Sequence, residues 1–566
     1  MQNKISGWIF SVLLMLVVIS GCNNKHPANT IQLVPTPAEM NANVSKNVGD
    51  VMDYALANNG KINDSIKLLM PGFVKAFYNQ NENHNIWSNN EQWEPIADSL
   101  YEFIAASQVY GLYPSDYHYR ELQNLKNKVA LDSTARKDAN TWTKADLMLT
   151  DAFMAISMHL KDGRLRPDTI ALRADTLLTD SFYIRNLTKA LHEKKVVPVF
   201  TSFEPTHRGY LELKAALPSL LDSMDKKIYT TIKFPNKDPQ SLANAVNLRL
   251  SEGGFLDSSS KTADSLSLAL GIKKYQQSKR LKRDGKISIG LVNSLNTSDT
   301  ERFKRIAITL DRYKQLPNKL PNKYIWVNIP SFFMEVREND SLVMRSKIIV
   351  GKPTTHTPSL TSAVSDMVTY PQWTIPNSII KKDILPALKK DPGYLARKGF
   401  SLVDFHGETI DPYSVNWEKY TKEIPYKVVQ GSGDDNALGV LKFNFSNPYH
   451  VYLHDTNQRN LFKNSSRALS HGCVRVQDWQ KLAFYISRND SLNQKPGSVL
   501  NYNTDSIKNW LAQKVKKRII IQNRIPVFIR YFTCEPISGK IIFYDDVYGE
   551  DKILGDKYFA GRNIVI

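Results

Sequence analysis

Residues 470–475 read Ser-His-Gly-Cys-Val-Arg and hold the side chains that nucleophilic chemistry needs. Cys473 lies beside a glycine, with His471 two positions before it and His454 further upstream. A cysteine attacks a carbonyl carbon well only as a thiolate, and a neighbouring imidazole is the usual group that produces one near neutral pH. The segment therefore predicts acyl transfer through a thioester.

The neighbouring residues can supply the other parts of such a site. Gly472 allows close approach of the backbone and a positive φ, so its N–H and that of the next residue can form an oxyanion hole. Arg475 can bind a substrate carboxylate through paired hydrogen bonds. His454 follows the apolar run 449–453 and is expected at the end of a strand. Residue chemistry alone leaves His454 and His471 in competition for the role of base.

Cys473 also has two other interpretations. The chain has three cysteines, and an exported protein can join Cys473 and Cys534 in a disulfide if Cys22 carries a lipid. Zinc accepts nitrogen and sulfur ligands, so Cys473, His454 and His471 can also hold a metal. No carboxylate pattern and no second cysteine joins that set, so we expect neither a metal nor another cofactor.

The composition favours several domains in anionic surroundings. The chain has 566 residues, of which 42% are hydrophobic, which is ample for a core and too long for one domain. A formal net charge of +19 suits nucleic acid, phospholipid headgroups or an anionic cell wall. The sequence has no long Lys/Arg block and no zinc-finger spacing, so nucleic acid is not an expected partner.

The first residues, 1–21, have the pattern of a secretory signal. Lys4 gives a positive start, and the apolar run 8–19 is shorter than the about 20 residues of an ordinary membrane-spanning helix. The Ile-Ser-Gly-Cys sequence that ends at Cys22 resembles a bacterial lipoprotein signal, with cleavage before Cys22 and a lipid on that cysteine. An ordinary signal or an anchor with an incidental cysteine is the alternative. We expect a protein that is tethered to a membrane rather than embedded in it.

Two segments follow the signal before the first compact unit. Residues 22–48 are mainly Asn, Pro, Thr, Lys and Ala, which predicts a flexible linker. Residues 49–235 carry apolar side chains at helical spacing, for example in 146–160, and show no catalytic spacing. They are therefore interpreted as a helical scaffold domain.

Residues 238–300 are expected to form a compact helical unit. Leu242, Val246 and Leu250 share one helix face, and two consecutive glycines end that helix. The unit resembles the small three-helix peptidoglycan-binding domain in its glycine-containing loop, its Lys-Lys-Tyr-Gln-Gln segment, its Asp-Gly turn and its final Leu-Asn. This resemblance implies binding to the cell wall; a unit that only packs against its neighbours is the alternative.

The pattern changes from helical to strand-like in residues 322–490, which we interpret as the catalytic domain. Residues 372–435 interrupt the strands with a helical stretch and a polar loop, which predicts an inserted cap or lid. Residues 491–566 are expected to extend this domain with edge structure. The predicted fold class is multidomain α+β: a helical scaffold, a small three-helix unit, and a mainly β domain with a helical and loop cap.

At this point the catalytic segment can be compared with a family. The run from Ser470 to Arg475 matches the Ser/Thr-His-Gly-Cys-x-Arg/Asn signature of L,D-transpeptidases with a YkuD-type domain. A Gly-Lys-Pro segment at Gly351, followed by Thr357-Pro, resembles the family's segment after the first hairpin. The Trp-x-x-Pro at Trp373 resembles the start of the cap in large multidomain members.

This resemblance implies a role for each site residue. Cys473 is the nucleophile and His454 the base, with the second ring nitrogen of His454 held by a backbone carbonyl such as that of Asp455. The residues that would shape the site or position the substrate are Ser470, His471, Gly472 and Arg475.

The implied reaction has two halves and needs no metal or nucleotide. The Cys473 thiolate attacks the carbonyl between the third and fourth residues of a peptidoglycan stem tetrapeptide, and D-alanine leaves. A side-chain amine of a second stem then attacks the thioester and closes a 3→3 cross-link. Carbapenems are expected to acylate the same cysteine.

The implied partners are peptidoglycan stem peptides, the cell wall and, through a lipid anchor, a membrane. The implied location is the periplasmic side of the bacterial cell envelope. Two other functions stay open at this point. An L,D-carboxypeptidase or another cysteine peptidase would use water as the acceptor, and a non-catalytic lipoprotein would act through the helical unit alone.

Overall fold

The structure is a computed structural model. It describes residues 30–165, 178–225, 227–257, 264–279, 281, 283–317, 319–494, 497 and 499–562. The predicted signal and Cys22 lie outside the described residues. Among the described residues, no helix is both long enough and apolar enough to cross a membrane. The chain divides into two compact units, of which the first comprises residues up to Ile104, Asp116–Ile156 and Leu178–Val199, and the second comprises the rest.

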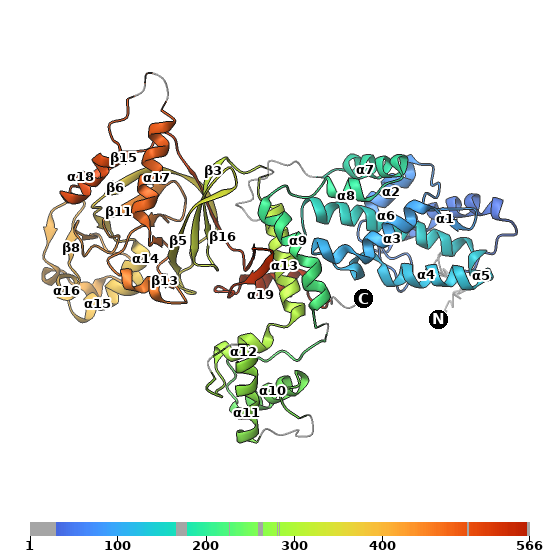
Figure 1. Cartoon of the computed structure of the whole chain (residues 1–566), viewed down its shortest axis with the longest axis horizontal. Coiled ribbons are helices and arrows are strands. Elements are labelled where there is room, and N and C mark those ends of the chain that lie inside the picture. The colour runs from blue at the N-terminus through green and yellow to red at the C-terminus, as the bar shows by residue number, and fades with distance from the viewer. Residues whose placement is uncertain are drawn as a thin grey trace, which may run out of the picture. The chain divides into compact units, whose positions relative to one another are not determined.

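The first unit is helical, as the sequence predicts for the scaffold. Its main helices are α1 (Pro37–Ala57), α2 (Pro71–Gln80), α3 (Pro95–Ala105), α4 (Tyr119–Leu131), α6 (Ala139–Lys161) and α7 (Asp180–Glu193) (Figure 1). Two buried carboxylates on α6 hold the loops between these helices. Asp146 accepts hydrogen bonds from the Trp87 N–H and the Tyr78 hydroxyl, at 2.8 and 2.6 Å, and Asp151 accepts one from the Met70 N–H at 2.7 Å.

The flexible linker predicted for 22–48 is wrong over its second half. Helix α1 begins at Pro37, and Met40, Val44 and Val48 are buried along one of its faces. These three apolar residues are spaced four apart, which is the helical period. The segment is polar as a whole, which concealed this pattern. A surface helix needs only one apolar stripe to pack, so most of its residues can be polar.

Residues 238–300 form the expected three-helix unit, which is seen as a separate group in Figure 1. Its helices are α10 (Pro239–Glu252), α11 (Ser265–Ser278) and α12 (Ile289–Asn296). A capping side chain starts each of them, from Asp238, Asp264 and Ser288 respectively. Val246 and Ile272 lie in the small core that the three helices share.

A separate core lies around α9 (Arg208–Ser223) and α13 (Asp299–Lys314), and it includes residues from the end of the chain. Phe303 and Leu310 of α13 pack there with Leu213 of α9 and with Phe532. Helix α9, which lies within the predicted scaffold range 49–235, thus packs with α13 in the second unit. Sequence periodicity identifies both helices and does not indicate their partners.

The catalytic domain is built on a ten-stranded sheet. Its strands are β3 (Lys323–Asn328), β4 (Phe333–Glu338), β5 (Ser341–Gly351), β6 (Leu360–Thr369), β11 (Leu441–Phe445), β12 (Leu453–His454), β13 (Ala468–Ser470), β14 (Val474–Val476), β15 (Lys517–Ile520) and β16 (Pro526–Arg530). The order is β11-β12-β14-β5-β4-β3-β16-β6-β15, with β13 on β5. A further β11–β6 pairing closes the sheet into a ring. Helix α17 (Trp479–Leu492) packs on its core through Leu482 and Ile486 (Figure 1).

The expected edge role of residues 491–566 is wrong for β16. This strand pairs in parallel with β3 and antiparallel with β6, so it is an interior strand of the sheet. Ile529 is fully buried there, opposite Val327 of β3 and Leu360 of β6. A parallel partner distant in sequence leaves no turn signal, so the sequence does not reveal the neighbours of β16.

The cap is inserted between β6 and β11, as predicted, but it is more than helix and loop. It contains α14 (Asn377–Ile379), a π-helical segment η4 (Ile380–Ile384), α15 (Leu385–Lys390) and α16 (Tyr394–Arg397). It also contains a four-stranded sheet of β7 (Trp373–Thr374), β8 (Phe400–Val403), β9 (Thr409–Ile410) and β10 (Lys427–Gln430). Leu388, Leu402, Trp417 and Val428 form a core of its own. Strands of two to four residues are too short to show an alternating pattern.

The interior position of β16 predicts a large difference between two isoleucine truncations. Ile529→Ala should lower the free energy of unfolding by about 2–5 kcal/mol, because it leaves a cavity in the core. Ile520→Ala, in β15 and 55% exposed, should change it by less than about 0.5 kcal/mol. Denaturant unfolding of the two variants measures this difference. Equal small losses would mean that β16 is an edge strand.

Candidate active site

Two neighbouring strands carry the candidate nucleophile and base. Strand β12 runs parallel to β14, with Leu453 opposite Val474 and His454 opposite Arg475. Leu453 and Val474 are fully buried in the core of the sheet. Because side chains alternate along a strand, His454 and Arg475 face the other side, and so does Cys473 at the start of β14. The register thus places His454 next to the strand that Cys473 precedes, and the Cys473 Sγ lies 3.9 Å from the His450 carbonyl oxygen; that His454 acts on Cys473 stays a prediction.

His454 is buried and neutral. Its exposed fraction is 4%, and its Nδ1 is hydrogen-bonded to the backbone carbonyl of Asp455. Burial, together with the nearby Arg475 charge, lowers the pKa of His454 to about 3, while the contacts with the Asp455 and Leu438 carbonyls act in the opposite direction. A carbonyl can only accept, so the contact with Asp455 favours the tautomer that carries its proton on Nδ1. This tautomer is the one that a general base requires.

Cys473 is a thiol in the resting site. It is half-buried, and burial raises its pKa above the ordinary value, while Tyr452, Lys442 and Arg475 act in the opposite direction. A neutral imidazole and a protonated thiol differ from the reactive thiolate expected near neutral pH. The physical reason is that burial disfavours charge on both groups.

A tyrosine and a lysine complete the face around the sulfur. Lys442 of β11 is paired with His454 of β12, and its Nζ lies 3.6 Å from the ring centroid of Tyr452. The rings of Tyr452 and His454 are 5.9 Å apart. Tyr452 stands two positions before His454, on the same face of the strand, so the alternation of side chains is a signal that could have identified it.

Arg475 retains hydrogen-bonding capacity on this face. Its Nη1 donates to Gln458 Oε1 at 2.9 Å, whereas its buried Nε has no hydrogen-bond partner among the described residues. A buried guanidinium nitrogen without an acceptor is costly, and an anionic ligand would satisfy it. The role predicted for Arg475, holding a carboxylate, is compatible with this geometry.

The hydroxyl of Ser470 closes the loop 470–473, which carries the candidate nucleophile. This buried oxygen donates to the Cys473 carbonyl at 2.6 Å and accepts from the Gly472 N–H at 3.0 Å. Gly472 has a φ of 121°, which side-chain-bearing residues rarely adopt. The expected use of the Gly472 N–H in an oxyanion hole is therefore wrong for this conformation, since the serine already occupies that donor.

His471 does not join the other candidate residues. Its side chain is exposed, and its Nε2 lies 3.0 Å from Asp383 Oδ2, on the π-helical segment of the cap. This contact leaves His454 as the base candidate and removes His471 from the possible zinc set. It also ties the cap to the loop that carries the nucleophile.

The alternative disulfide is not formed. Cys473 and Cys534 are both free, and Cys534 is buried against α13, with its Sγ 3.2 Å from Thr309 Oγ1. Burial raises the pKa of Cys534 to about 12, so this second thiol is protonated and unreactive.

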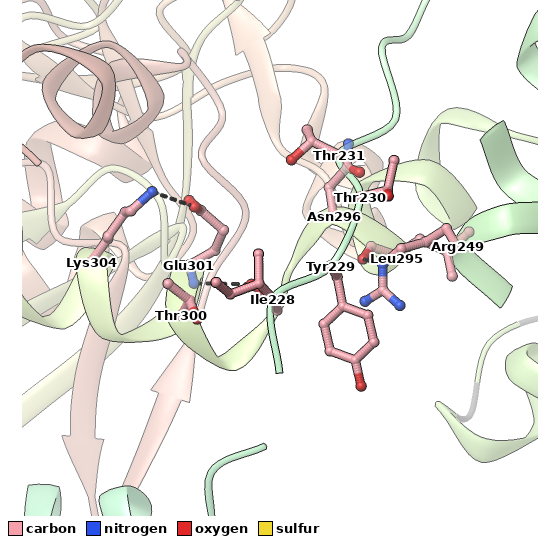
Figure 2. A pocket seen from close by; sticks show the side chains of 11 residues that line it. Ile228, Tyr229, Thr230, Thr231, Arg249, Leu295, Asn296, Thr300, Glu301 and Lys304 are labelled. Atoms are coloured by element: carbon pink, nitrogen blue, oxygen red, sulfur yellow. Dashed lines mark hydrogen bonds and ion pairs between the residues drawn. The ribbon is translucent and has the colours of Figure 1, made fainter. Parts of the chain in front are cut away.

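A pocket beside the three-helix unit is lined by polar groups that are already paired (Figure 2). Arg249 lies over the ring of Tyr229 at 3.7 Å and donates to the Leu295 carbonyl at 3.1 Å. Glu301 and Lys304 form an ion pair of 2.6 Å. Nothing in this pocket marks a wall ligand, and wall binding by the unit stays a prediction.

Comparison with known proteins identifies two parts of the chain. Residues 72–217 match the model of a scaffold domain, and residues 322–498 match that of the L,D-transpeptidase catalytic domain. A protein of Haemophilus influenzae with a provisional L,D-transpeptidase name is 35% identical over 250 residues, which are 44% of this chain and 48% of that protein. The match thus spans about half the length of this curated relative.

Two solved structures share the same family name. An L,D-transpeptidase from Mycobacterium smegmatis is 11% identical, with a TM-score of 0.18 over 38% of this chain and 61% of its own. One from Enterococcus faecium is 11% identical, with a TM-score of 0.15 over 56% and 99%. These scores are too low to carry an argument. Residues 322–498 nevertheless match the model of the L,D-transpeptidase catalytic domain, of the YkuD type, which agrees with the resemblance seen in the sequence.

The protonation states predict the pH dependence of Cys473 alkylation. Because the pKa of the thiol is raised and that of His454 is lowered, we expect both groups to be uncharged near neutral pH. The rate with iodoacetamide should still be rising at pH 8.5, about the ordinary pKa of a cysteine. Mass spectrometry of the labelled protein measures it, with Cys473→Ala as the blank. A rate plateau between pH 6 and 7 would contradict this reading of the site.

Proposed function

We propose that this chain is an L,D-transpeptidase that cross-links peptidoglycan stem peptides through a thioester on Cys473. The observation that supports it most directly is the parallel pairing of β12 and β14, which brings Cys473 and a neutral His454 to one face of the sheet. The family of the catalytic domain supplies the substrate class. The alternative acceptor, water, is treated below as an outcome of the experiment.

In the first half-reaction the thiol and the imidazole act together. His454 Nε2 takes the proton of Cys473 as the sulfur attacks the carbonyl between the third and fourth residues of a stem tetrapeptide. The peptide C–N bond then breaks, and the same proton passes to the departing amine of D-alanine. This order avoids a standing charge pair, which the burial of both groups would make costly.

The charges around the sulfur suit a substrate that ends in a carboxylate. Lys442 and Arg475 lie on the same face as Cys473, and Arg475 has a buried Nε without a partner among the described residues. A tetrapeptide carries its carboxylate on the fourth residue, next to the bond that breaks. Binding of this anion beside the reacting carbonyl would position it for attack.

In the second half-reaction an amine replaces the departed D-alanine. His454 accepts the proton of the incoming side-chain amine as its nitrogen attacks the thioester, and the sulfur leaves as the thiol. A cap over the thioester would favour this amine by limiting access of water. We propose the His471–Asp383 contact as one of the points where the cap closes.

The location follows from the same proposal. Peptidoglycan lies outside the cytoplasmic membrane, so we propose that Cys22 carries a lipid that holds the protein in the cell envelope. The +19 net charge would favour contact with the anionic wall and membrane surface. Wall binding by residues 238–300 is part of this proposal.

The test is incubation of the purified protein with tetrapeptide muropeptides, followed by mass spectrometry. The wild type should release D-alanine and form 3→3 dimers, and Cys473→Ala should do neither. His454→Ala should slow release by about 10²–10⁴-fold, the usual contribution of a general base. Release of D-alanine without any dimer would mean a carboxypeptidase, and no release at all would refute chemistry at this site.

A further inference from the structure

Tyr548 belongs to the C-terminal segment, beyond the matched catalytic domain, yet it reaches the catalytic loops. It is 9% exposed, and its hydroxyl donates to the Gly351 carbonyl at 2.8 Å and accepts from the Thr357 N–H at 3.1 Å. Its ring is stacked on that of His356, at 4.0 Å between centroids and 7° between planes. The tyrosine thereby fixes both ends of the loop 351–357.

This loop holds the peptide bond that precedes the nucleophile. The Thr357 hydroxyl accepts from the Gly351 N–H at 2.8 Å and donates to the Gly472 carbonyl at 2.7 Å. The Gly472 carbonyl and the Cys473 N–H belong to one planar trans peptide, so they point in opposite directions. Whatever fixes the Gly472 carbonyl therefore also fixes the direction of the Cys473 N–H.

Further contacts hold the loop 351–357 against the loop that carries Cys473, so the two cannot move separately. The Thr355 hydroxyl and the Lys352 N–H both donate to the Ser470 carbonyl at 3.0 Å. At Gly351 a Cβ would lie 2.0 Å from the Thr355 carbonyl, so only glycine fits this turn. Tyr548 thus acts on two loops that are held together. Loss of its hydroxyl is therefore expected to change the position of the peptide bond next to Cys473.

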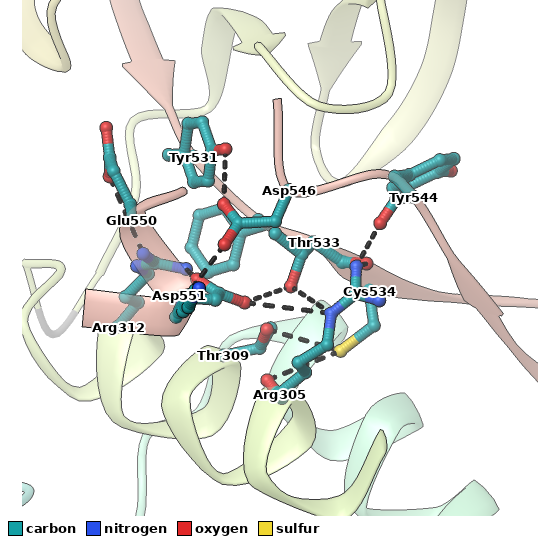
Figure 3. A network of polar contacts seen from close by, with 12 residues as sticks. Arg305, Thr309, Arg312, Tyr531, Thr533, Cys534, Tyr544, Asp546, Glu550 and Asp551 are labelled. Atoms are coloured by element: carbon teal, nitrogen blue, oxygen red, sulfur yellow. Dashed lines mark hydrogen bonds and ion pairs between the residues drawn. The ribbon is translucent and has the colours of Figure 1, made fainter. Parts of the chain in front are cut away.

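Tyr548 is itself anchored through Tyr531 to a polar network that includes Arg312 of α13; Figure 3 shows Tyr531, Asp546, Arg312 and Asp551 of this network. The Tyr548 N–H donates to the Tyr531 hydroxyl at 2.8 Å, and that hydroxyl donates to Asp546 at 2.6 Å. Arg312 of α13 lies 5.3 Å from the Tyr531 ring centroid and forms an ion pair of 2.5 Å with Asp551. Burial raises the pKa of Tyr548, so its hydroxyl keeps its proton and can donate to Gly351.

We propose that Tyr548 is a positioning residue of the active site: through Thr357 it aims the Cys473 N–H at the oxygen that becomes negative during acyl transfer. The inference deepens the proposed function and rests on it for the natural substrate. With the Gly472 N–H bonded to Ser470, the Cys473 N–H is the donor that this loop has left from the predicted oxyanion hole. The residues that would orient it come from three separate parts of the sequence.

The experiment compares two tyrosines of the same segment. Tyr548→Phe removes the hydroxyl and keeps the ring, whereas Tyr544→Phe removes a hydroxyl that donates to Glu535 at 2.9 Å, away from the catalytic loops. Acylation of Cys473 by p-nitrophenyl acetate forms the S-acetyl bond, releases nitrophenolate and passes through an oxyanion. Alkylation by iodoacetamide is a displacement at carbon and has none.

Tyr548→Phe should slow acylation by about tenfold or more while alkylation stays within about twofold of the wild type. Tyr544→Phe should leave both rates unchanged. Thr357→Val should behave like Tyr548→Phe, and Thr357→Ser, which keeps the hydroxyl, should retain the wild-type acylation rate. Thermal unfolding of all four variants reports whether the fold persists.

Two results would overturn the proposal. Equal slowing of acylation and alkylation in Tyr548→Phe would mean that the hydroxyl serves the fold and not the oxyanion, and an unchanged acylation rate would mean that it serves neither. The ester probe does not depend on the natural substrate. If the wild type reacts with the ester but leaves muropeptides unchanged, the proposed function fails while the role of Tyr548 stands.

Discussion

The parallel pairing of β12 with β14 is the constraint on which the site depends. It buries Leu453 against Val474 and, by alternation alone, turns His454 and Cys473 to the opposite face. A shift of one residue in this register would bury the imidazole in the core and expose a leucine. Packing on the opposite side of the same two strands thus fixes which side chains face the site. The core that packs there comes from most of the catalytic domain.

Burial has two consequences for the reacting groups. It keeps the imidazole neutral and the thiol protonated, and it strengthens every hydrogen bond that is made to charge during the reaction. The basic groups Lys442 and Arg475 lie on the same face, and within the part of the chain that the structure describes the buried Arg475 Nε has no acceptor, so an anion would complete this face. A site of this kind selects ligands that carry a negative charge, because binding such a ligand relieves the unfavourable energy of its empty form.

Local signals in the sequence point to Cys473 as the candidate nucleophile and place His454 at a strand end, whereas the choice of His454 over His471 as the base rests on the family resemblance. The sequence was sufficient for the three-helix unit and for the insertion of a cap. It could not show that β16 is interior or that α9 packs with α13, because those neighbours are far apart in the chain. The strands of the cap are too short to show a pattern, and the overall polarity of the segment around α1 hid its helical stripe. The contact of Tyr548 with Gly351 leaves no signal in the sequence of either segment.

The position of β16 has a consequence for how the chain reaches its native state. β3 and β6 each need this strand as a partner, and it follows both of them far along the chain. Until it arrives, both strands present unpaired backbone edges, which are templates for aggregation. Closing the ring also requires contacts of very long sequence separation, which form slowly. Folding of the catalytic domain is therefore expected to follow synthesis, and a chain cut after residue 498 would lack both an interior strand and the tyrosine beneath its nucleophile.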